Sequence, residues 1–347
     1  MSEVQTKTDV EELFQELDQK RPLELFAEVP CPMKQRFRTA YEAFEKSYYE
    51  QTGKRFYTFV PTTCPAGIEI DDTARDLMAA KTLDDLPDIC VSYGLEAFSM
   101  PKFREVFIEK GAFQPVVDVS GVPFFNSEEF HDRYHCYNTI ACFPQVMLID
   151  RKKLGDRPVP ESWKDLMNPI YKDSISLPSG HGAIETTLLM HIYKEYGDEG
   201  IDAIDHNVKV SMGGSIAART AGTNRPEAAA IYIMPWIFAA GAVKGDQIFI
   251  SWPKEGILIE PIILMVKSTL SKAQQPLLDF MLSKEVAEIF SENYYISTHP
   301  EVPSKLPEGV NVKWLGWDYI FDTDMVEIYN RLTERFYDYL PEKHKIK

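Results

Sequence analysis

The chain has 347 residues, of which 44% are apolar and 26% charged, a composition typical of a folded protein with a sizeable core. Its formal net charge of −16 argues against a nucleic-acid partner and an anionic membrane surface, because both would repel it at long range. No run of about eighteen apolar residues occurs, so the sequence predicts no membrane insertion.

The N-terminal stretch, residues 1–22, predicts a helical appendage, because Val10, Leu13 and Leu17 recur at helical spacing. It lacks the basic start, apolar core and small-residue cleavage site of a secretory signal. The five cysteines stand at irregular spacings and are expected to be reduced rather than paired in a disulfide framework. The sequence as it stands therefore predicts a cytoplasmic protein. A periplasmic or other extracytoplasmic location is the alternative if a signal peptide has been removed.

The first third of the chain alternates predicted strands with helices. Strands are expected at 23–29, 56–60 and 86–94, and aromatic residues at helical spacing predict a helix over 37–48 that ends near Gly53. This alternation is typical of an open, parallel α/β sheet. Ligands of such sheets bind outside the carboxyl ends of the strands. The turns that contain Cys31, Cys64 and Ser92 are therefore predicted to face one crevice.

The next segment, 134–150, is long, apolar and extended, which predicts a connection between two lobes. Residues 158–196 then predict a short helix with Ser162 as its N-cap, a strand over 174–177 and a loop, 178–182, that opens a second helix. Glycines at a helix N-terminus let a ligand approach the backbone and favour negative charge. This loop is thus a candidate anion site, and an ordinary strand-to-helix turn is the alternative.

The remaining elements continue the α/β pattern. Strands are predicted at 208–212 and 228–234, and the small-residue loop 213–215 stands between them. Residues 248–266 are extended again and predict the return crossing to the first lobe. Amphipathic helices are predicted at 277–290 and 325–339.

Four stretches in order resemble a known family. They read FRTAYEAFEKSYYEQTGKRF, PVPESWKDLMNPIYKDSISLPS, SWPKEG and LLDFMLSKEVAEIFSENYYISTHPEVP, and together they span most of residues 23–303. The chain is similar to the solute-binding proteins of ABC transporters with the periplasmic-binding-protein type II fold, in the branch with ferric-iron, thiamine and polyamine binders. The resemblance implies an α/β fold of two lobes, 23–118 with 260–347 and 119–259, which close over a ligand at two extended hinge crossings.

One feature of the ferric binders is missing from the expected place. They commonly hold iron with adjacent tyrosines of the second lobe, whereas residues 231–236 contain one tyrosine, Tyr232. The pair Tyr294–Tyr295 follows the late helix and falls in the predicted first lobe. Direct coordination of ferric iron is therefore not expected from this pattern.

The candidate site residues carry three kinds of chemistry. Cys31, Cys64 and His181 are candidate ligands of a thiophilic metal or an iron–sulfur species. The alternative is that both cysteines are small apolar residues that fill space in the core. Lys34 adds positive charge beside the loops, or is a solvated lysine. Aromatic rings at three positions are candidates for stacking on a ligand, or are core residues. The predicted ligand-binding residues are Cys31, Lys34, Thr62, Thr63, Cys64, Ser92, Tyr93, Ser179, Gly180, His181, Gly182, Gly214, Ser215, Tyr232 and Trp236.

The function predicted from these patterns is a monomeric solute-binding protein that captures a small anionic ligand or a metal ion or complex and works with an ABC permease. No catalytic residue is predicted, because the chain has no GxSxG, Walker, HExxH or dinucleotide-binding motif. No cofactor is predicted apart from a metal ion or cluster at the cysteines. The alternative function is an intracellular metal or iron–sulfur carrier, or a cysteine-dependent enzyme, on the same clamp.

Overall fold

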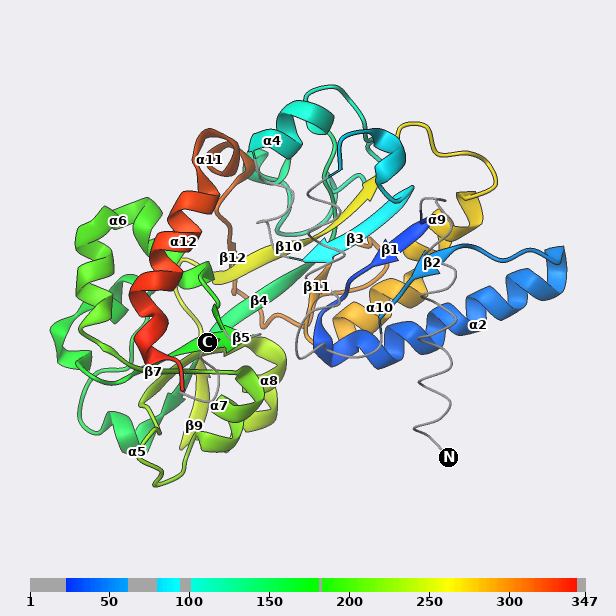
Figure 1. Ribbon diagram of the computed structural model, residues 1–347. Helices are drawn as coiled ribbons and strands as arrows, with labels where there is room; N and C mark the ends of the chain where they lie inside the picture. The colour runs from blue at the N-terminus through cyan, green and yellow to red at the C-terminus, as the bar shows by residue number, and fades with distance from the viewer. Residues whose placement is uncertain (1–22, 62–79, 94–100, 181–182, 342–347) are drawn as a thin grey trace.

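The computed structural model describes residues 23–61, 80–93, 101–180 and 183–341. Within these ranges, twelve strands form a mixed sheet, whose main path is β2-β1-β3-β10-β4-β8-β5-β6 (Figure 1). The helical appendage predicted over 1–22 lies outside these ranges. Among the described residues, no helix combines the length and apolar character that a membrane span needs.

The first part of the sheet is parallel, as predicted. β1 (Leu25–Ala27) pairs in parallel with β2 (Thr58–Phe59) and β3 (Ile89–Tyr93). The long helix α2 (Lys34–Thr52) connects β1 to β2, and it ends at Gly53, whose φ of 66° places it in the left-handed region that glycine adopts without strain.

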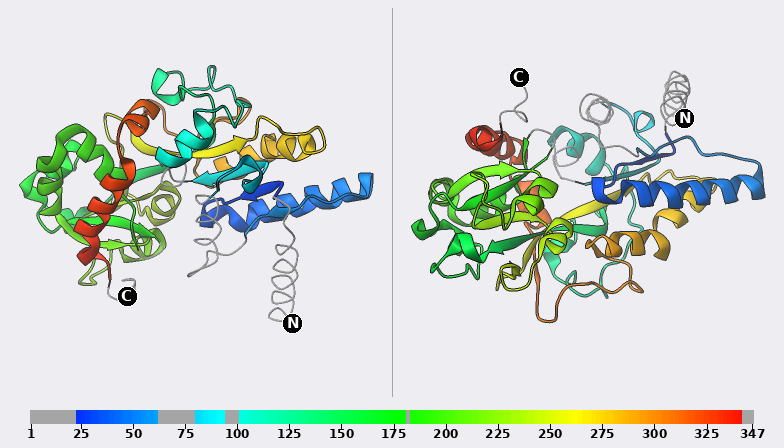
Figure 2. Two further views of the ribbon diagram at one scale, coloured as in Figure 1. Left: turned by 45° about the horizontal axis from the view of Figure 1, so that its top comes forward. Right: turned by 90° about the horizontal axis from the view of Figure 1, so that it is seen from below.

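Three helices cover one face of these strands. α9 (Gln275–Met281) and α10 (Lys284–Glu292) pack beside α2, and the rings of Phe44 and Phe280 stack 4.7 Å apart between them (Figure 2). The sequence predicted one helix over 277–290. It is divided because the Ser283 hydroxyl accepts the Val286 N–H and caps a new helix.

Two long strands cross the middle of the molecule. β4 (Asn138–Asp150) pairs with β10 (Ile257–Val266) along its first half and with β8 and β9 along its second, and it changes partners at Gln145. β10 pairs in turn with β3 through residues 262–266. The two crossings predicted from sequence are thus one hydrogen-bonded pair of strands, and the sheet continues through both halves of the protein (Figure 1).

The second half contains strands β5, β6, β7, β8 and β9 with helices α6, α7 and α8. α6 precedes β7, whereas α7 and α8 pack on each other and on β4 and β5. The bounds are β5 Ile175–Gly180, β6 Ala183–Ile184, α6 Thr187–Asp205, β7 Val208–Met212, α7 Gly214–Thr220, β8 Ile231–Pro235, α8 Trp236–Ala242 and β9 Ile248–Ser251.

Shorter helical turns connect these elements. The predicted helix at 162–167 is one of them; its regular part begins at Lys164, with Trp163 as the N-cap residue, and the Ser162 hydroxyl accepts the Asp165 N–H just before it. Their bounds are Cys31–Met33, Leu83–Asp85, Pro101–Phe103 (α4), Arg104–Ile108, Glu128–Phe130, Arg151–Leu154 (α5), Lys164–Met167, Pro169–Tyr171 and Tyr337–Tyr339.

The C-terminal region returns to the second half. β11 (Ile296–Ser297) pairs with β4, β12 (Val312–Lys313) pairs with the start of β10, and α11 (Trp317–Asp322) leads into α12 (Met325–Phe336), which lies along α6 (Figure 1). The predicted assignment of 260–347 to the first lobe stays a prediction for 260–311. From β12 onward, we propose that the chain belongs with the second lobe, because α12 packs on α6.

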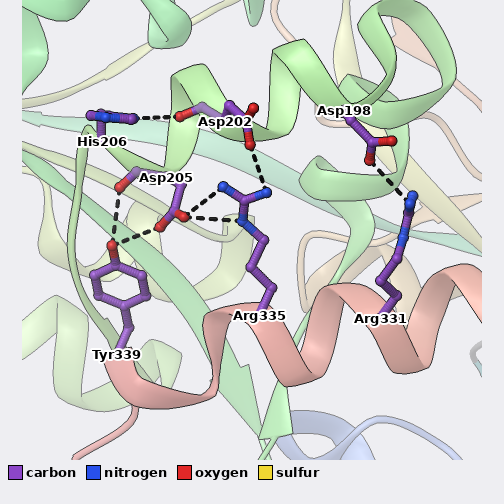
Figure 3. A network of polar contacts seen from close by, with 7 residues as sticks. All are labelled: Asp198, Asp202, Asp205, His206, Arg331, Arg335 and Tyr339. Atoms are coloured by element: carbon purple, nitrogen blue, oxygen red, sulfur yellow. Dashed lines mark hydrogen bonds and ion pairs between the residues drawn. The ribbon is translucent and has the colours of Figure 1, made fainter.

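Ion pairs join α12 to α6 (Figure 3). The Arg335 guanidinium binds Asp202 at 2.7 Å and Asp205 at 2.8 Å, and Arg331 binds Asp198 at 3.1 Å. The Tyr339 hydroxyl donates to the Asp205 carboxylate at 2.7 Å. The Asp205 carboxylate therefore forms an ion pair with Arg335 and accepts a hydrogen bond from Tyr339, both in the C-terminal region.

We expect Asp205→Asn to lower the free energy of unfolding by about 1 kcal/mol at low salt, because it removes the charge from two charge-assisted contacts. The loss should shrink in about 1 M NaCl, which screens exposed charges. Chemical denaturation at both salt concentrations measures it. Asp198→Asn is the matched control, since its single ion pair involves a carboxylate that is 68% exposed. An equal loss in both variants would contradict the prediction.

Candidate functional site

A carboxylate occupies the loop that was predicted to bind an anion. β5 continues through Gly180 and forms a hairpin with β6, after which the Glu185 N–H donates to the Pro178 carbonyl at 3.0 Å. A Cβ added to Gly180 would lie 3.2 Å from Oε1 of Glu185. The side chain of Glu185 thus bends back over the strand end. An acidic group therefore already lies there, just before the N-terminus of α6 at Thr187.

This carboxylate is hydrogen-bonded to the crossing strands. Gln145 of β4 donates its Nε2 to Glu185 Oε2 at 3.3 Å and to Thr187 Oγ1 at 3.1 Å. The Thr187 hydroxyl donates in turn to Oε1 of Glu260, on β10. Gln145 is fully buried, whereas Glu185 and Glu260 stay partly exposed. The two carboxylates therefore belong to one polar chain at the point where β4 changes partners.

Electrostatics in this polar chain favour the protonated form of Glu185. Burial and the nearby charge of Glu260 raise the pKa of Glu185 to about 7. At neutral pH the folded protein therefore carries a proton on Glu185 for part of the time.

Raising the pH from about 5 to about 8 should destabilise the wild type relative to Glu185→Gln. The folded-state pKa of Glu185 lies above the unfolded value, so the protonated form stabilises the fold and this contribution is lost as the pH rises through about 7. Glutamine keeps the neutral form at every pH. The difference in unfolding free energy between the two proteins, measured across this range, should grow with pH. A constant difference would contradict the prediction, and the exposed Glu161→Gln serves as control.

A tyrosine between α10 and β11 lies close to this polar chain. Tyr295 is 2% exposed, and its ring packs 5.7 Å from Phe143 of β4. Burial, followed by the charges of Tyr93 and Glu185, raises the pKa of Tyr295 well above its usual range. Tyr295 therefore lies close enough to Tyr93 of β3 and to Glu185 to be affected by both charges. We call Gln145, Glu185, Thr187, Glu260 and Tyr295 the crossing cluster.

An aromatic contact joins the two halves beside this cluster. The ring of Trp236, at the start of α8, lies 5.2 Å from that of Tyr294 and 5.5 Å from that of Trp252. The Lys305 ammonium lies 4.9 Å from the centre of the Tyr294 ring. Trp236 is 4% exposed, so its predicted stacking position is taken by protein rings in this structure.

Several predicted site residues lie together at the ends of β5 and β7. A Cβ on Gly213 would lie 3.5 Å from the Ser179 carbonyl oxygen, so the strand end with Ser179 and Gly180 meets the start of α7. A Cβ on Gly214 would overlap the Phe238 ring of α8, which explains the need for glycine there. Ser215 is exposed in the first turn of α7. The structure therefore brings the two predicted small-residue loops side by side.

The predicted ligand-binding residues near the N-terminal strands lie at the end of β3 and just after β1. Ser92 is buried and Tyr93 is half-buried, both where β3 meets β10. Lys34 begins α2 and is 2% exposed, which contradicts a solvated lysine. Burial lowers the pKa of Lys34, against the opposing effect of Glu28.

Two predictions need correction. Tyr232 is fully buried in β8, and its hydroxyl accepts the Ala229 N–H, so it is a core residue and not a ring that faces a ligand. Cys31 is disulfide-bonded, so the expectation of a reduced thiol is wrong at this position. A disulfide sulfur is not a thiolate, the form that binds metals. The other described cysteines are free and buried: Cys90, Cys136 and Cys142.

Five predicted residues lie outside the described residues: the metal-ligand candidates Cys64 and His181, and the ligand-binding candidates Thr62, Thr63 and Gly182. Within the described ranges, no three His, Cys, Asp or Glu side chains are close enough together to hold a metal.

Sequence reasoning missed the crossing cluster. Glu185 stands three residues after Gly182, and Tyr295 was noticed only as half of a tyrosine pair. Gln145 and Glu260 look like ordinary positions within apolar strands. A polar side chain in an otherwise apolar crossing strand was the one available signal.

The sequence pattern of the bacterial extracellular solute-binding protein family matches residues 84–323, more than half of the chain. The chain belongs to this family. No functionally curated protein matches the sequence of this solute-binding protein. Solved structures share its fold at low identity. One is from Trichodesmium (IdiA, FutA) with iron and citrate, at a TM-score of 0.59 and 13% identity, covering 91% of this chain and 98% of that one.

Two further structures show the same architecture. The ferric binding protein from Campylobacter jejuni has a TM-score of 0.57 and 18% identity, over 89% of this chain and 98% of that one. AfuA from Actinobacillus pleuropneumoniae with fructose-6-phosphate has a TM-score of 0.55 and 15% identity, over 92% and 98%. The predicted two-lobed periplasmic-binding-protein type II fold is thereby confirmed, and the family confirms the predicted function of a solute-binding protein. The carrier or cysteine-dependent enzyme is not favoured.

The predicted cytoplasmic location is wrong. The family is extracellular, and the compared structures include a periplasmic binding protein. The disulfide at Cys31 agrees with this correction, because disulfides persist in oxidising compartments outside the cytoplasm.

Proposed function

We propose that this solute-binding protein captures its ligand between the two lobes, beside the crossing cluster, and closes over it by bending at β4 and β10. The observation that supports this is the hydrogen-bonded chain from Gln145 to Glu185, Thr187 and Glu260, which joins both crossing strands to the start of α6. A ligand that contacts this chain would touch the segments whose relative movement opens and closes the lobes.

The ligand class predicted from sequence, a small anion or a metal ion or complex, is carried into this proposal. The compared structures hold iron with citrate in one case and fructose-6-phosphate in another. We further propose that the protein acts as a monomer, has no catalytic activity of its own and delivers the ligand to an ABC permease.

Small-angle X-ray scattering combined with thermal unfolding tests closure. A ligand that binds between the lobes should raise the melting temperature and reduce the radius of gyration, since closure makes the protein more compact. Ferric citrate, manganese, inorganic phosphate, fructose-6-phosphate and putrescine form the panel. Stabilisation without compaction would place the ligand outside the lobes' interface. No response to any of them would reject capture of these ligand classes.

A further inference from the structure

We propose that the rings of Trp236 and Tyr294 form a clasp between the two lobes, so that the closed form is stabilised by the protein itself as well as by the ligand. We call these two rings the aromatic clasp. The inference rests on the proposed capture between the lobes, and it names the positioning residues that set how readily the lobes close. Neither ring needs to touch the ligand for this role.

The first argument is the origin of the two rings. Trp236 begins α8, which packs on α7 and β8 in the second lobe. Tyr294 follows α10, which packs beside α2 in the predicted first lobe. The centres of the two rings lie 5.2 Å apart. The contact therefore joins elements that belong to different lobes.

The second argument is the position of the clasp on the crossing strand β4. Trp236 directly follows Pro235, which pairs with Gln145, the residue at which β4 changes partners. Tyr294 lies two residues before β11, which pairs with β4 at Cys142. A bend of β4 between these two positions would move the rings apart. Because the attraction between atoms in contact weakens steeply when a gap of about 1 Å opens, such a bend would break the clasp.

The third argument is that each ring is held by a neighbour on its own side. The ring of Trp252, just after β9, lies 5.5 Å from that of Trp236 at an angle of 88°. On the other side, the Lys305 ammonium lies 4.9 Å from the centre of the Tyr294 ring and donates to the Glu292 carbonyl at 3.2 Å. Trp236 is 4% exposed, so opening would return part of its surface to water, which opposes opening.

The backbone of Tyr294 gives the fourth argument. Its φ of 65° lies in the left-handed region, which is unfavourable for a tyrosine. The Tyr294 N–H donates to the Ser291 carbonyl and the Tyr295 N–H to the Phe290 carbonyl, both at 3.1 Å, a pattern that ends α10 and usually contains glycine. A ring at a position whose backbone suits glycine supports a role for that ring.

Small-angle X-ray scattering of the ligand-free proteins measures the clasp. Trp236→Ala and Tyr294→Ala should each lower the ratio of closed to open protein by about fivefold, seen as a larger radius of gyration. The double variant should be no more expanded than either single variant, because the same contact is lost. Tyr294→Phe keeps the ring and should stay as compact as the wild type. Phe280→Ala, which removes a ring stacked on Phe44 within one lobe, is the control and should lower the melting temperature without expansion.

Tyr294→Gly separates closure from stability. Glycine relieves the left-handed backbone but removes the ring, so this variant should unfold at a higher temperature than Tyr294→Ala and yet be as expanded. If Tyr294→Gly were as compact as the wild type, the ring would have only a structural role and the inference would be rejected.

The outcomes separate the clasp from the proposed function. An unchanged radius of gyration in Trp236→Ala would overturn the clasp, whether or not a ligand compacts the wild type. Greater expansion of the double variant than of either single variant would also overturn it, since the two rings would then act separately. If ferric citrate, manganese, inorganic phosphate, fructose-6-phosphate and putrescine all fail to compact the wild type, the proposed capture is rejected for these ligands, and the ligand-free measurements still decide the clasp.

Discussion

Gly256→Ala should lower the free energy of unfolding by about 3 kcal/mol or more, the largest effect we expect from any single methyl group. Gly256 precedes β10 with a φ of +102°, which side chains rarely adopt. Its added Cβ would lie 2.8 Å from the carbonyl carbon and oxygen of Asn311. That backbone cannot easily withdraw, because the Asn311 carbonyl accepts the Ile257 N–H at 2.9 Å beside the β10–β12 pair.

Chemical denaturation of Gly256→Ala and Gly241→Ala measures this effect against a matched control. Gly241 lies in α8, and nothing lies within 4 Å of its added Cβ. Its replacement should be neutral or stabilise the protein by up to about 1 kcal/mol, as alanine favours helix. Equal stability of the two variants would show that the backbone at Asn311 can move aside.

Asp88→Ala should cost about 2–3 kcal/mol, because it leaves the ammonium of Lys267 without its counter-charge. The Lys267 Nζ atom lies 3.1 Å from Asp88 Oδ1, and the two side chains are 4% and 23% exposed. Replacing both residues, Asp88→Ala with Lys267→Met, should cost less than the single change, since the buried charge is then removed. Urea denaturation of the three proteins tests this order.

The ion pair of Lys254 with Glu161 is the exposed counterpart, with side chains that are 74% and 63% exposed. Glu161→Ala should change the unfolding free energy by less than about 0.5 kcal/mol, because solvent screens this pair. If Asp88→Ala were as mild, or if the double variant were the least stable, the charge of Lys267 would not be the cause of the loss.

Much of the element order could be predicted from local patterns. The strand at 208–212 was placed correctly as β7, and the helix that ends at Gly53 was placed correctly as α2. Hydrophobic periodicity and turn residues depend on a few neighbouring positions, so the local sequence is enough to predict these helices and strands. The break at Ser283 was missed because the apolar spacing of α9 continues in phase into α10.

The candidate site was predicted only in part. Ser179, Gly180 and Gly214 do lie together, because they stand at or just beyond the ends of the neighbouring parallel strands β5 and β7, which meet at one edge. The sign of charge at this edge was not predictable from the loop alone. It depends on Glu185 folding back through the β5–β6 hairpin and on Glu260 arriving from a distant strand.

The sequence by itself determined the alternating α/β elements, the two long crossing segments and, through four short stretches, the family. Only the tertiary structure decided that the crossings pair with each other, that α12 returns to α6 and that two carboxylates share one polar chain at Gln145. The reason is physical. Backbone preference and hydrophobic period are local properties, whereas strand pairing, burial and the interaction of charges join residues far apart in the chain.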